Sequence, residues 1–392
     1  MEKVINLGIP HVGELIFESV DTSELIQYLL VSETWKILAE NVLFKRWKGR
    51  IFEACEHGQT KIVELLLDRC GSKKENKDRS DRTIDLNARD EAGYTALMVA
   101  CIAGHKGVVQ LLLNYSESTI DLNERDESNG FSHGFTAFMM ACTTGHKDVV
   151  QVLLDHSDQN LNAKDNIHGF TGFMWACYKG EKHVVQLLLD HSNIELDARD
   201  GEGRTAFLIA CELGETDIVQ SLICRSGQGA GLNVNAIENF GINAFMLACL
   251  NGHKDVVKLL FNHLGKNLRL NDRDFVGRTA FIFACVEGYK DIVQFLLNCS
   301  DIELNGKDDL GFTGFMWACF KGHKDVVKLL LEHTKVVDIT IAEGIGFTMP
   351  NEIKELLLTK NDLNIGRQEC DRLESEVPEM PKKSLARKST EG

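Results

Sequence analysis

The sequence predicts an all-α solenoid, in which short pairs of helices stack along one axis. An Ala-Cys dipeptide returns eight times, and successive copies lie 34 to 46 residues apart. Repeats of this length are typical of units that bury their apolar faces against their neighbours. In each copy a short apolar segment is followed by a glycine and then by a second apolar segment. The copies are Ala54-Cys55, Ala100-Cys101, Ala141-Cys142, Ala176-Cys177, Ala210-Cys211, Ala248-Cys249, Ala284-Cys285 and Ala318-Cys319.

The unit that begins at Asp165 shows the expected elements in order. Asp165 opens a tight turn, and Thr171 is placed to cap the start of a short apolar helix over residues 173–177. Gly180 ends this helix, and residues 184–189 form a second, more apolar helix. A loop then leads to the next turn.

This order of turn, short helix, glycine and longer helix resembles the ankyrin repeat. The opening Thr-Pro-Leu-His of that family appears as Thr-Ala-Leu-Met at residues 95–98, and its Gly-His turn appears at residues 104–105. Its Val-Asn-Ala-Arg-Asp ending corresponds to residues 86–90. The opening lacks the family's proline and histidine, so we expect packing of Met and Phe to replace the hydrogen bonds of that histidine. The resemblance covers residues 50 to 358 and implies a protein-binding surface with β-hairpin-like tips.

The ends of the chain differ from the repeats and set the predicted domain boundaries. The first unit lacks the turn and is predicted to be a half-repeat, and the last unit has lost most of the pattern. The final segment is poor in apolar residues and is predicted to be disordered. The predicted domains are a helical domain (1–50), the repeat array (51–358) and a disordered tail (359–392). The array is predicted to contain a half-repeat with a loop (51–86), seven full repeats (87–336) and a cap (337–358).

Composition narrows the class of partner. The formal net charge is −15 and the pI is about 5.4, which argues against nucleic acid or an anionic membrane as the main partner. No apolar run approaches the roughly 18 residues of a membrane-spanning helix. Acidic residues at the turns, such as Asp126, Asp200, Asp274 and Asp308, would weakly favour a basic ligand.

The twelve cysteines do not indicate a disulfide framework. Eight occupy one equivalent helical position, where cysteine packs as a small apolar side chain. In adjacent helix pairs they would lie roughly 10 Å apart, beyond the reach of a disulfide. We therefore expect a reducing compartment, the cytoplasm or alternatively the nucleus.

Residues 1–50 resemble an F-box. The pattern runs through Pro10 and an ungapped register from Ile16 to Trp35, although the segment before Phe17 is one residue short and Phe44 replaces the closing tryptophan. The resemblance implies docking on a Skp-type adaptor of a cullin complex. An ordinary helical cap on the first repeat is the alternative. The implied adaptor contacts are Pro10, Leu15, Ile16, Leu25, Val31 and Trp35.

No catalytic or metal-binding constellation is found in the sequence. The repeated cysteines lack a neighbouring base, and one histidine per Gly-His turn cannot assemble a four-ligand metal site. These histidines, such as His105, are expected to bind loop carbonyls instead. We predict no enzymatic activity and no cofactor.

Variable positions among constant core residues predict a target-binding groove. They lie just before the helix-capping residue and near the end of the first helix, and several are aromatic or arginine, the types that dominate interfaces. Two tryptophans, Trp175 and Trp317, occur in nearly identical segments; we expect them to pack between repeats, with matched binding anchors as the alternative. The predicted groove residues are Tyr94, Phe135, Phe170, Tyr178, Arg204, Arg278, Phe312 and Phe320.

These observations lead to one hypothesis and two rivals. The hypothesis is a monomeric substrate-recognition subunit of an SCF-type cullin–RING ubiquitin ligase, with an unknown target protein in the groove. One rival is an ankyrin scaffold whose N-terminal helices only cap the stack. The other is a microbial effector that recruits a host ubiquitin ligase.

Overall fold

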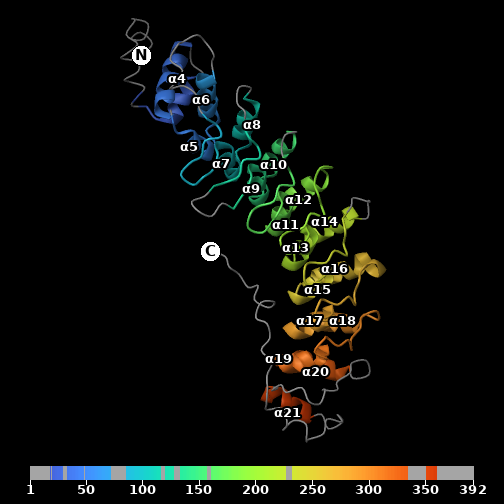
Figure 1. Cartoon of the computed structure of the whole chain (residues 1–392). Helices are drawn as coiled ribbons and strands as arrows, with labels where there is room; N and C mark the ends of the chain where they lie inside the picture. Colours follow the sequence, from blue (N-terminus) through green and yellow to red (C-terminus); the bar gives the residue numbers. More distant parts are fainter. Residues whose placement is uncertain are drawn as a thin grey trace. The chain divides into compact units, whose positions relative to one another are not determined.

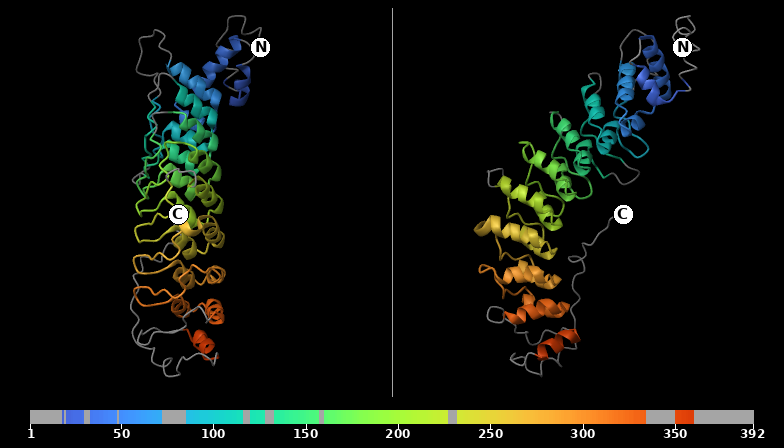
Figure 2. Two further views of the ribbon diagram at one scale, coloured as in Figure 1. Left: turned by 90° about the vertical axis from the view of Figure 1, so that its right-hand side faces the viewer. Right: turned by 180° about the vertical axis from the view of Figure 1, so that it is seen from behind.

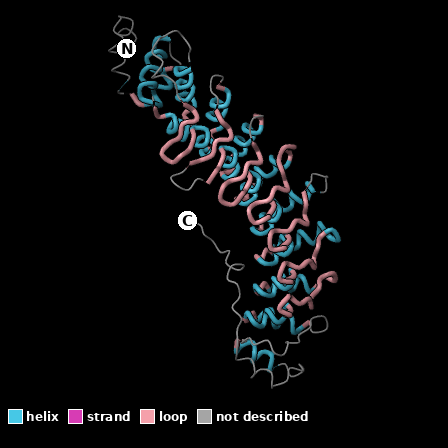
Figure 3. The backbone as a smooth tube through the Cα atoms, viewed as in Figure 1, coloured by secondary structure: helices cyan, strands magenta, loops and turns pink. Residues whose placement is uncertain are grey.

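A computed structural model describes residues 18, 20–29, 33–47, 49–71, 85–115, 120–127, 133–156, 160–226, 232–333 and 350–359. The chain divides into two compact units, residues 1–206 and residues 207–392, here called unit 1 and unit 2. The described residues form helices joined by turns and loops, with isolated backbone bridges from Arg89 to Thr95 and from Ile237 to Asn243 (Figure 3). The predicted all-α class is confirmed for this part of the chain.

Unit 1 begins with two helices that precede the repeats, and α4 packs on both α3 and α6. The first helices of successive repeats then contact one another from α5 through α7 and α9 to α11, and the second helices do so from α6 through α8 and α10 to α12 (Figure 1). The helices are α3 (Thr22–Tyr28), α4 (Glu33–Trp47), α5 (Ile51–Glu56), α6 (Thr60–Gly71), α7 (Ala96–Ala103), α8 (Lys106–Asn114), α9 (Ala137–Thr143), α10 (Lys147–Leu154), α11 (Gly172–Tyr178) and α12 (Lys182–Leu189).

Within unit 2 the helices also form two rows. The first helices α15, α17 and α19 stack in one row, and the second helices α14, α16, α18 and α20 stack in another, with α21 packed on α20 (Figure 2). The helices are α13 (Ala206–Leu213), α14 (Thr216–Ser226), α15 (Ala244–Leu250), α16 (Lys254–Leu264), the short 3-10 helix η1 (Gly265–Asn267), α17 (Ala280–Glu287), α18 (Lys290–Leu297), α19 (Gly314–Lys321), α20 (Lys324–Glu332) and α21 (Asn351–Thr359).

Most first helices follow the local rules that the sequence predicts, although α5 has no side-chain N-cap. In α11, the side chain of Thr171 accepts a hydrogen bond from the backbone N–H of Met174, as an N-cap should. Gly180 follows the helix with a φ of 74°, a conformation that glycine adopts without steric cost. The Ala-Cys pair faces the core, and all eight cysteines of the pattern are buried.

Burial raises the pKa of several of these cysteines. It raises the pKa of Cys55 and of Cys319 to about 12, and it raises the pKa of Cys101 and Cys211 still further. A thiol that stays protonated at neutral pH neither attacks substrates nor binds metals readily. Their predicted role as small core side chains is therefore confirmed.

The ends of the array can be compared only in part. The predicted half-repeat corresponds to α5 and α6, and the predicted terminal helix corresponds to α21. Residues 72–84, 334–349 and 360–392 lie outside the described residues. The predicted loop after the half-repeat, most of the predicted cap and the predicted tail fall there.

Candidate protein-binding surface

Seven hairpin turns connect the repeats. Each begins at an acidic residue, and that residue is buried in every turn except the first. In the fourth turn the backbone N–H of Asp200 donates to the carbonyl of Arg204 at 2.9 Å. Oδ1 of Asp200 accepts the backbone N–H groups of Glu202 and Arg204, so one carboxylate oxygen closes the whole turn. Hairpin turns 1 to 7 comprise residues 90–94, 126–135, 165–170, 200–204, 238–242, 274–278 and 308–312.

In turns 3, 4, 6 and 7 the second oxygen of the Asp carboxylate, Oδ2, accepts a hydrogen bond from one of two kinds of side chain. In turns 4 and 6 the arginine that ends the turn donates from Nε, at 2.8 Å, to Oδ2 of Asp200 or Asp274. In turns 3 and 7 the last residue is phenylalanine, and a tryptophan of the following helix donates instead. Nε1 of Trp317 lies 2.7 Å from Oδ2 of Asp308, and Trp175 makes the equivalent bond in turn 3. The two tryptophans therefore support their own turns.

The ring contacts of the two tryptophans differ. The ring of Trp175 lies 5.1 Å from that of Phe135 in the preceding repeat, so the expected inter-repeat packing is confirmed there. The ring contacts of Trp317 are with Phe312 and Phe320 of its own repeat.

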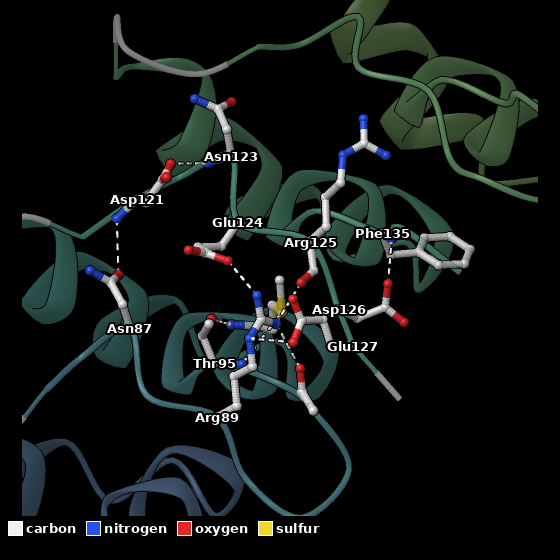
Figure 4. Close-up of polar contacts among 12 residues, drawn as sticks. Asn87, Arg89, Thr95, Asp121, Asn123, Glu124, Arg125, Asp126, Glu127 and Phe135 are labelled. Atoms are coloured by element: carbon white, nitrogen blue, oxygen red, sulfur yellow. Dashed lines mark hydrogen bonds and ion pairs between the residues drawn. The ribbon is translucent and has the colours of Figure 1, made fainter. Parts of the chain in front are cut away.

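Basic residues tie neighbouring hairpin turns together. The residue before each turn is Arg89, Arg125 and Lys164 in three successive repeats, and each donates to the carbonyl of the equivalent residue in the next repeat. Arg273 makes the same contact with the carbonyl of Lys307 in unit 2. Figure 4 shows the guanidinium group of Arg89 between Glu124 and Glu127 of the next repeat, both within ion-pair distance.

Asparagines and the Gly-turn histidines supply further ties. Oδ1 of Asn271 accepts the backbone N–H of Glu303, while its Nδ2 donates to the carbonyl of Asp301. His105 Nε2 bonds the carbonyl of Glu56 at 2.9 Å, and His253 Nε2 bonds the carbonyl of Glu212 at 2.8 Å. These histidines bind backbone carbonyls as predicted, but the carbonyls belong to the last turn of the first helix in the preceding repeat and not to a loop. The repeats also bury Met and Phe as expected, but packing alone does not join them.

The buried carboxylates change the electrostatic interpretation of the turns. Asp126, Asp200, Asp274 and Asp308 are all less than a tenth exposed. Because backbone, arginine or tryptophan groups bind these carboxylates, they offer little negative charge to a ligand. The expectation that acidic turns would favour a basic ligand is therefore wrong for these four residues.

The predicted groove residues differ widely in exposure. Tyr178 is 40% exposed, and Tyr94, Phe135 and Phe320 are half-buried. Phe170 and Phe312 are 2% and 7% exposed, which corrects their predicted place on an open surface. The two rings are buried because each packs against the tryptophan that holds its own turn.

The two predicted groove arginines are engaged within the chain. Arg204 pairs with Asp200 and Arg278 pairs with Asp274, and both side chains are largely buried. A guanidinium group held in this way first stabilises its own turn. Only its remaining exposed atoms could contact a partner.

The sequence analysis missed a row of exposed apolar side chains on the three turns of unit 2. Phe240, Phe275, Val276 and Leu310 lie at the turn tips and are between 50% and 69% exposed. With Ile237 they make up five of the ten most exposed large apolar side chains in the described chain. We call these five residues the apolar tip row. The sequence contains their signal, since the third position of each of these turns is apolar, as are the second position of turn 6 and the residue before turn 5.

Backbone contacts make the apolar tip row continuous. The N–H of Phe275 donates to the carbonyl of Phe240 at 2.9 Å, and the N–H of Asp309 donates to the carbonyl of Val276 at 3.1 Å. The ring of Phe275 also lies against Gly241, where a Cβ atom would come within 2.7 Å of it. Gly241 has a φ of 83°, so both its backbone conformation and this contact require glycine.

The predicted adaptor contacts are only partly within the described residues. Pro10, Leu15, Ile16 and Val31 lie outside them, as does the side chain of Trp35 in α4. Leu25 is fully buried where α3 packs on α4, which corrects its predicted place on a docking surface.

An exposed apolar residue does occur on α4. Ile37 is 55% exposed and was not among the predicted contacts. It lies two residues after Trp35.

Two further searches of the described residues give negative results. No group of three or more His, Cys, Asp and Glu side chains is arranged to hold a metal ion. No helix in the described ranges is long and apolar enough to cross a bilayer.

The comparisons with known proteins agree with this geometry. A family model described as ankyrin repeats (3 copies) matches residues 51–165, 161–237, 227–308 and 245–343. These matches begin at residue 51 and give no support to the F-box resemblance of the preceding segment. No curated protein gives a significant match. Ankyrin repeats indicate a protein–protein interaction module, and the chain belongs to the ankyrin-repeat family.

Proposed function

We propose that this chain is a non-enzymatic adaptor that holds a target protein on the hairpin turns and first helices of its ankyrin repeats. The apolar tip row is the observation that carries this proposal. Soluble proteins rarely leave a contiguous set of large apolar side chains in water unless a partner covers it. Aromatic residues such as Phe240 and Phe275 are also enriched where interfaces concentrate their binding energy.

A two-step experiment tests target binding at the tip row. The intact chain and its Phe240→Ser/Phe275→Ser variant are compared in affinity capture, and a protein that only the intact chain retains is then purified. The dissociation constant of the purified pair should rise by a factor of about 100 in the double variant, as expected for the loss of two aromatic anchors. Ile37→Ser, which also removes an exposed apolar side chain but lies on α4 outside the repeats, is the matched control. Equal affinity for intact and double-variant chains would refute binding at this row.

The more specific role is that of a substrate-recognition subunit in an SCF-type cullin–RING ubiquitin ligase. The F-box-like pattern from Ile16 to Trp35 supports it, because such a segment joined to a recognition array would dock a Skp-type adaptor. A stiff array would then hold target lysines near a ubiquitin-loaded enzyme, and the mechanism would be proximity. This role would place the protein in the cytoplasm or the nucleus. The rival scaffold role requires no adaptor, because packing of α4 on α6 already closes the first end of the array.

Binding to a purified Skp-type adaptor distinguishes these two roles. The full chain is compared with Trp35→Ala and Ile37→Asp, because Leu25 is buried and its replacement would disturb folding rather than docking. Lys61→Asp on α6, whose side chain is 62% exposed, is the control for an added negative charge. Tight binding that the first two variants weaken supports the ligase role. No binding by the intact, folded chain leaves the N-terminal helices as a cap.

A further inference from the structure

A continuous set of aromatic rings lies on the turns of unit 1, away from the apolar tip row in sequence. The ring of His133 lies 6.0 Å from that of Phe135, and Phe135 lies 5.1 Å from Trp175. His168 and Tyr178 lie 5.9 Å and 5.5 Å from the same tryptophan. Trp175 is thus the centre of a cluster that combines turns 2 and 3 with helix α11.

The rings around Trp175 are accessible although the tryptophan itself is buried. The side chain of His133 is 46% exposed, Tyr178 is 40% exposed, and His168 is also exposed. Ile167 at the tip of turn 3 adds an apolar side chain that is 54% exposed. We call His133, Phe135, Ile167, His168 and Tyr178 the aromatic patch. The backbone N–H of Asn166 donates to the carbonyl of His133, so the two turns that supply the patch are joined.

The charges beside the aromatic patch are basic. Nη1 of Arg125 lies 3.0 Å from the carbonyl of Gly134, which stands between two residues of the patch, and Lys179 Nζ lies 5.5 Å from the ring centre of Tyr178. Lys164, just before turn 3, donates to a backbone carbonyl. The contacts that the structure gives for Arg125, Lys164 and Lys179 are with neutral groups and not with carboxylates.

The nearby acids are already engaged. The carboxylate of Asp165 is buried and binds backbone N–H groups and Trp175, while that of Asp126 is buried beneath turn 2. Glu127 lies 3.6 Å from Arg89, and Glu202 lies 3.3 Å from Arg204. In a chain of net charge −15, the basic groups beside this patch are therefore not paired with a carboxylate, although Glu127 and Glu202 flank it.

We infer that the aromatic patch binds an acidic peptide segment that carries a central aromatic side chain. This inference rests on the proposed protein-binding function and specifies a partner class for unit 1. The aromatic side chain of the segment packs on Tyr178 and Phe135, and its carboxylates lie near Arg125, Lys164 and Lys179. Charge-assisted contacts of this kind give selectivity and speed association, while the rings supply most of the affinity.

A nucleic acid is the other polyanion with affinity for rings and basic groups. The positions of the remaining acids favour a peptide. Glu127 and Glu202, whose side chains are 68% and 43% exposed, flank the patch on turns 2 and 4. A phosphate backbone carries charge at every nucleotide and would meet these carboxylates, whereas a short peptide can confine its charge to the middle of the patch.

Fluorescence anisotropy with the full-length protein tests the inference directly. The probe is a short labelled peptide of Asp and Glu with a central Trp-Phe pair, and the comparison peptide replaces each acid by Lys. We expect the acidic peptide to bind at least tenfold more tightly than the basic one, and its affinity to fall as salt is added. Equal binding of the two peptides, or binding of neither, would overturn the inference.

Matched variants locate the site. Tyr178→Ala should weaken binding of the acidic peptide about tenfold or more, and Lys179→Glu should weaken it about three- to tenfold with a reduced dependence on salt. Lys106→Glu makes the same change of charge at the exposed start of α8, two repeats away, and should leave the affinity unchanged. Circular dichroism of each variant verifies folding. Lys179→Glu keeps the inference testable if Tyr178→Ala fails to fold, because the side chain of Lys179 is exposed.

Two outcomes separate this inference from neighbouring hypotheses. A single-stranded oligonucleotide that competes with the acidic peptide at equal affinity would overturn the choice of a peptide. Phe275→Ser should leave peptide binding unchanged, because it lies in the apolar tip row of unit 2. If that variant loses its target while no peptide binds the aromatic patch, the proposed function stands and this inference alone fails.

Discussion

Replacing Trp317 by phenylalanine should weaken hairpin turn 7 through one specific hydrogen bond. Nε1 of Trp317 donates to Oδ2 of Asp308 at 2.7 Å, and the carboxylate is 7% exposed. A hydrogen bond to a charged group contributes about 1.5–3 kcal/mol, because water cannot easily replace the lost donor. Trp317→Phe should therefore lower the free energy of local opening by about that amount.

Turn 6 indicates how this loss can be reversed. There Phe283 occupies the position of the tryptophan, and Nε of Arg278 binds Oδ2 of Asp274 while its guanidinium lies 4.6 Å from the ring centre of Phe283. The double variant Phe312→Arg/Trp317→Phe transfers this arrangement to turn 7. It should recover most of the lost stability, with a coupling energy of about 1.5 kcal/mol or more between the two positions.

Amide hydrogen exchange measures the effect where it arises. The N–H groups of Leu310 and Phe312 donate to Oδ1 of Asp308, so their exchange reports opening of turn 7. Exchange in peptides that cover this turn should accelerate about ten- to hundredfold in Trp317→Phe and return towards the original rate in the double variant. A repeat array need not unfold in one step, so this local measurement is preferable to a global melting curve.

Either of two results would refute the reasoning. Unchanged exchange in Trp317→Phe would mean that Oδ2 of Asp308 does not depend on the indole. Failure of the double variant to slow exchange relative to Trp317→Phe would mean that the arrangements of turns 6 and 7 are not interchangeable.

Three further predictions concern the N-terminal helices and the cysteines. Leu25→Asp should reduce helix content and make the first 50 residues sensitive to protease, because it buries a charge. Ile37→Asp should do neither. A Leu25→Asp chain with unchanged helix content and protease resistance would contradict the packing of α3 on α4. Cys224 is exposed and should react with a thiol reagent at once, while Cys211 should react only on unfolding, and rapid labelling of the latter would revive a catalytic role. Burial raises the pKa of Cys55 from 9.0 to about 12, so stability to urea should fall as the pH rises above 9.0, where the unfolded chain loses a proton that the folded chain keeps. Cys55→Ala should reduce this dependence by the share of one thiol, because the other buried cysteines keep theirs, and an unchanged pH dependence would contradict the burial of Cys55.

The features that the sequence predicted well are those that repeat locally. Thr171 caps its helix, Gly180 follows it, and Cys177 lies in the core, and α7, α9, α17 and α19 repeat this pattern. The cap and the glycine turn depend only on residues a few positions apart in the sequence, and the core position depends on the equivalent residue of a similar neighbouring repeat. In a repeat array, the sequence pattern therefore also predicts which residues pack against the next repeat.

The exposure of the last side chain of each turn could not be predicted from the repeat pattern, because it depends on which residue lies five positions later in the following helix. Phe135, Phe170 and Phe312 all precede the helix-capping threonine. The last two are buried because a tryptophan five residues later packs on them and holds the turn carboxylate, whereas Phe135 is followed by Met140 and remains half-buried. The sequence shows that phenylalanine at the end of turns 3 and 7 occurs with tryptophan five residues later. It does not show the buried carboxylate that binds this tryptophan and so accounts for the pair.

The turn carboxylates also explain why the net charge is a poor guide to what this array binds. In six of the seven turns an Asp side chain accepts backbone N–H groups of the turn, and five of these aspartates are buried, so they raise the formal negative charge but take little part in the surface. Arg125 and Lys164, which precede turns 2 and 3, use their hydrogen bonds on neutral groups and keep their charge. Arg89 and Arg273 also pair with glutamates of the next repeat. The turns can therefore present apolar side chains in unit 2 and basic and aromatic groups in unit 1 on a chain of charge −15. Partner selectivity then follows from which side chain occupies each turn tip, and it can change from repeat to repeat without altering the acids that hold the turns closed.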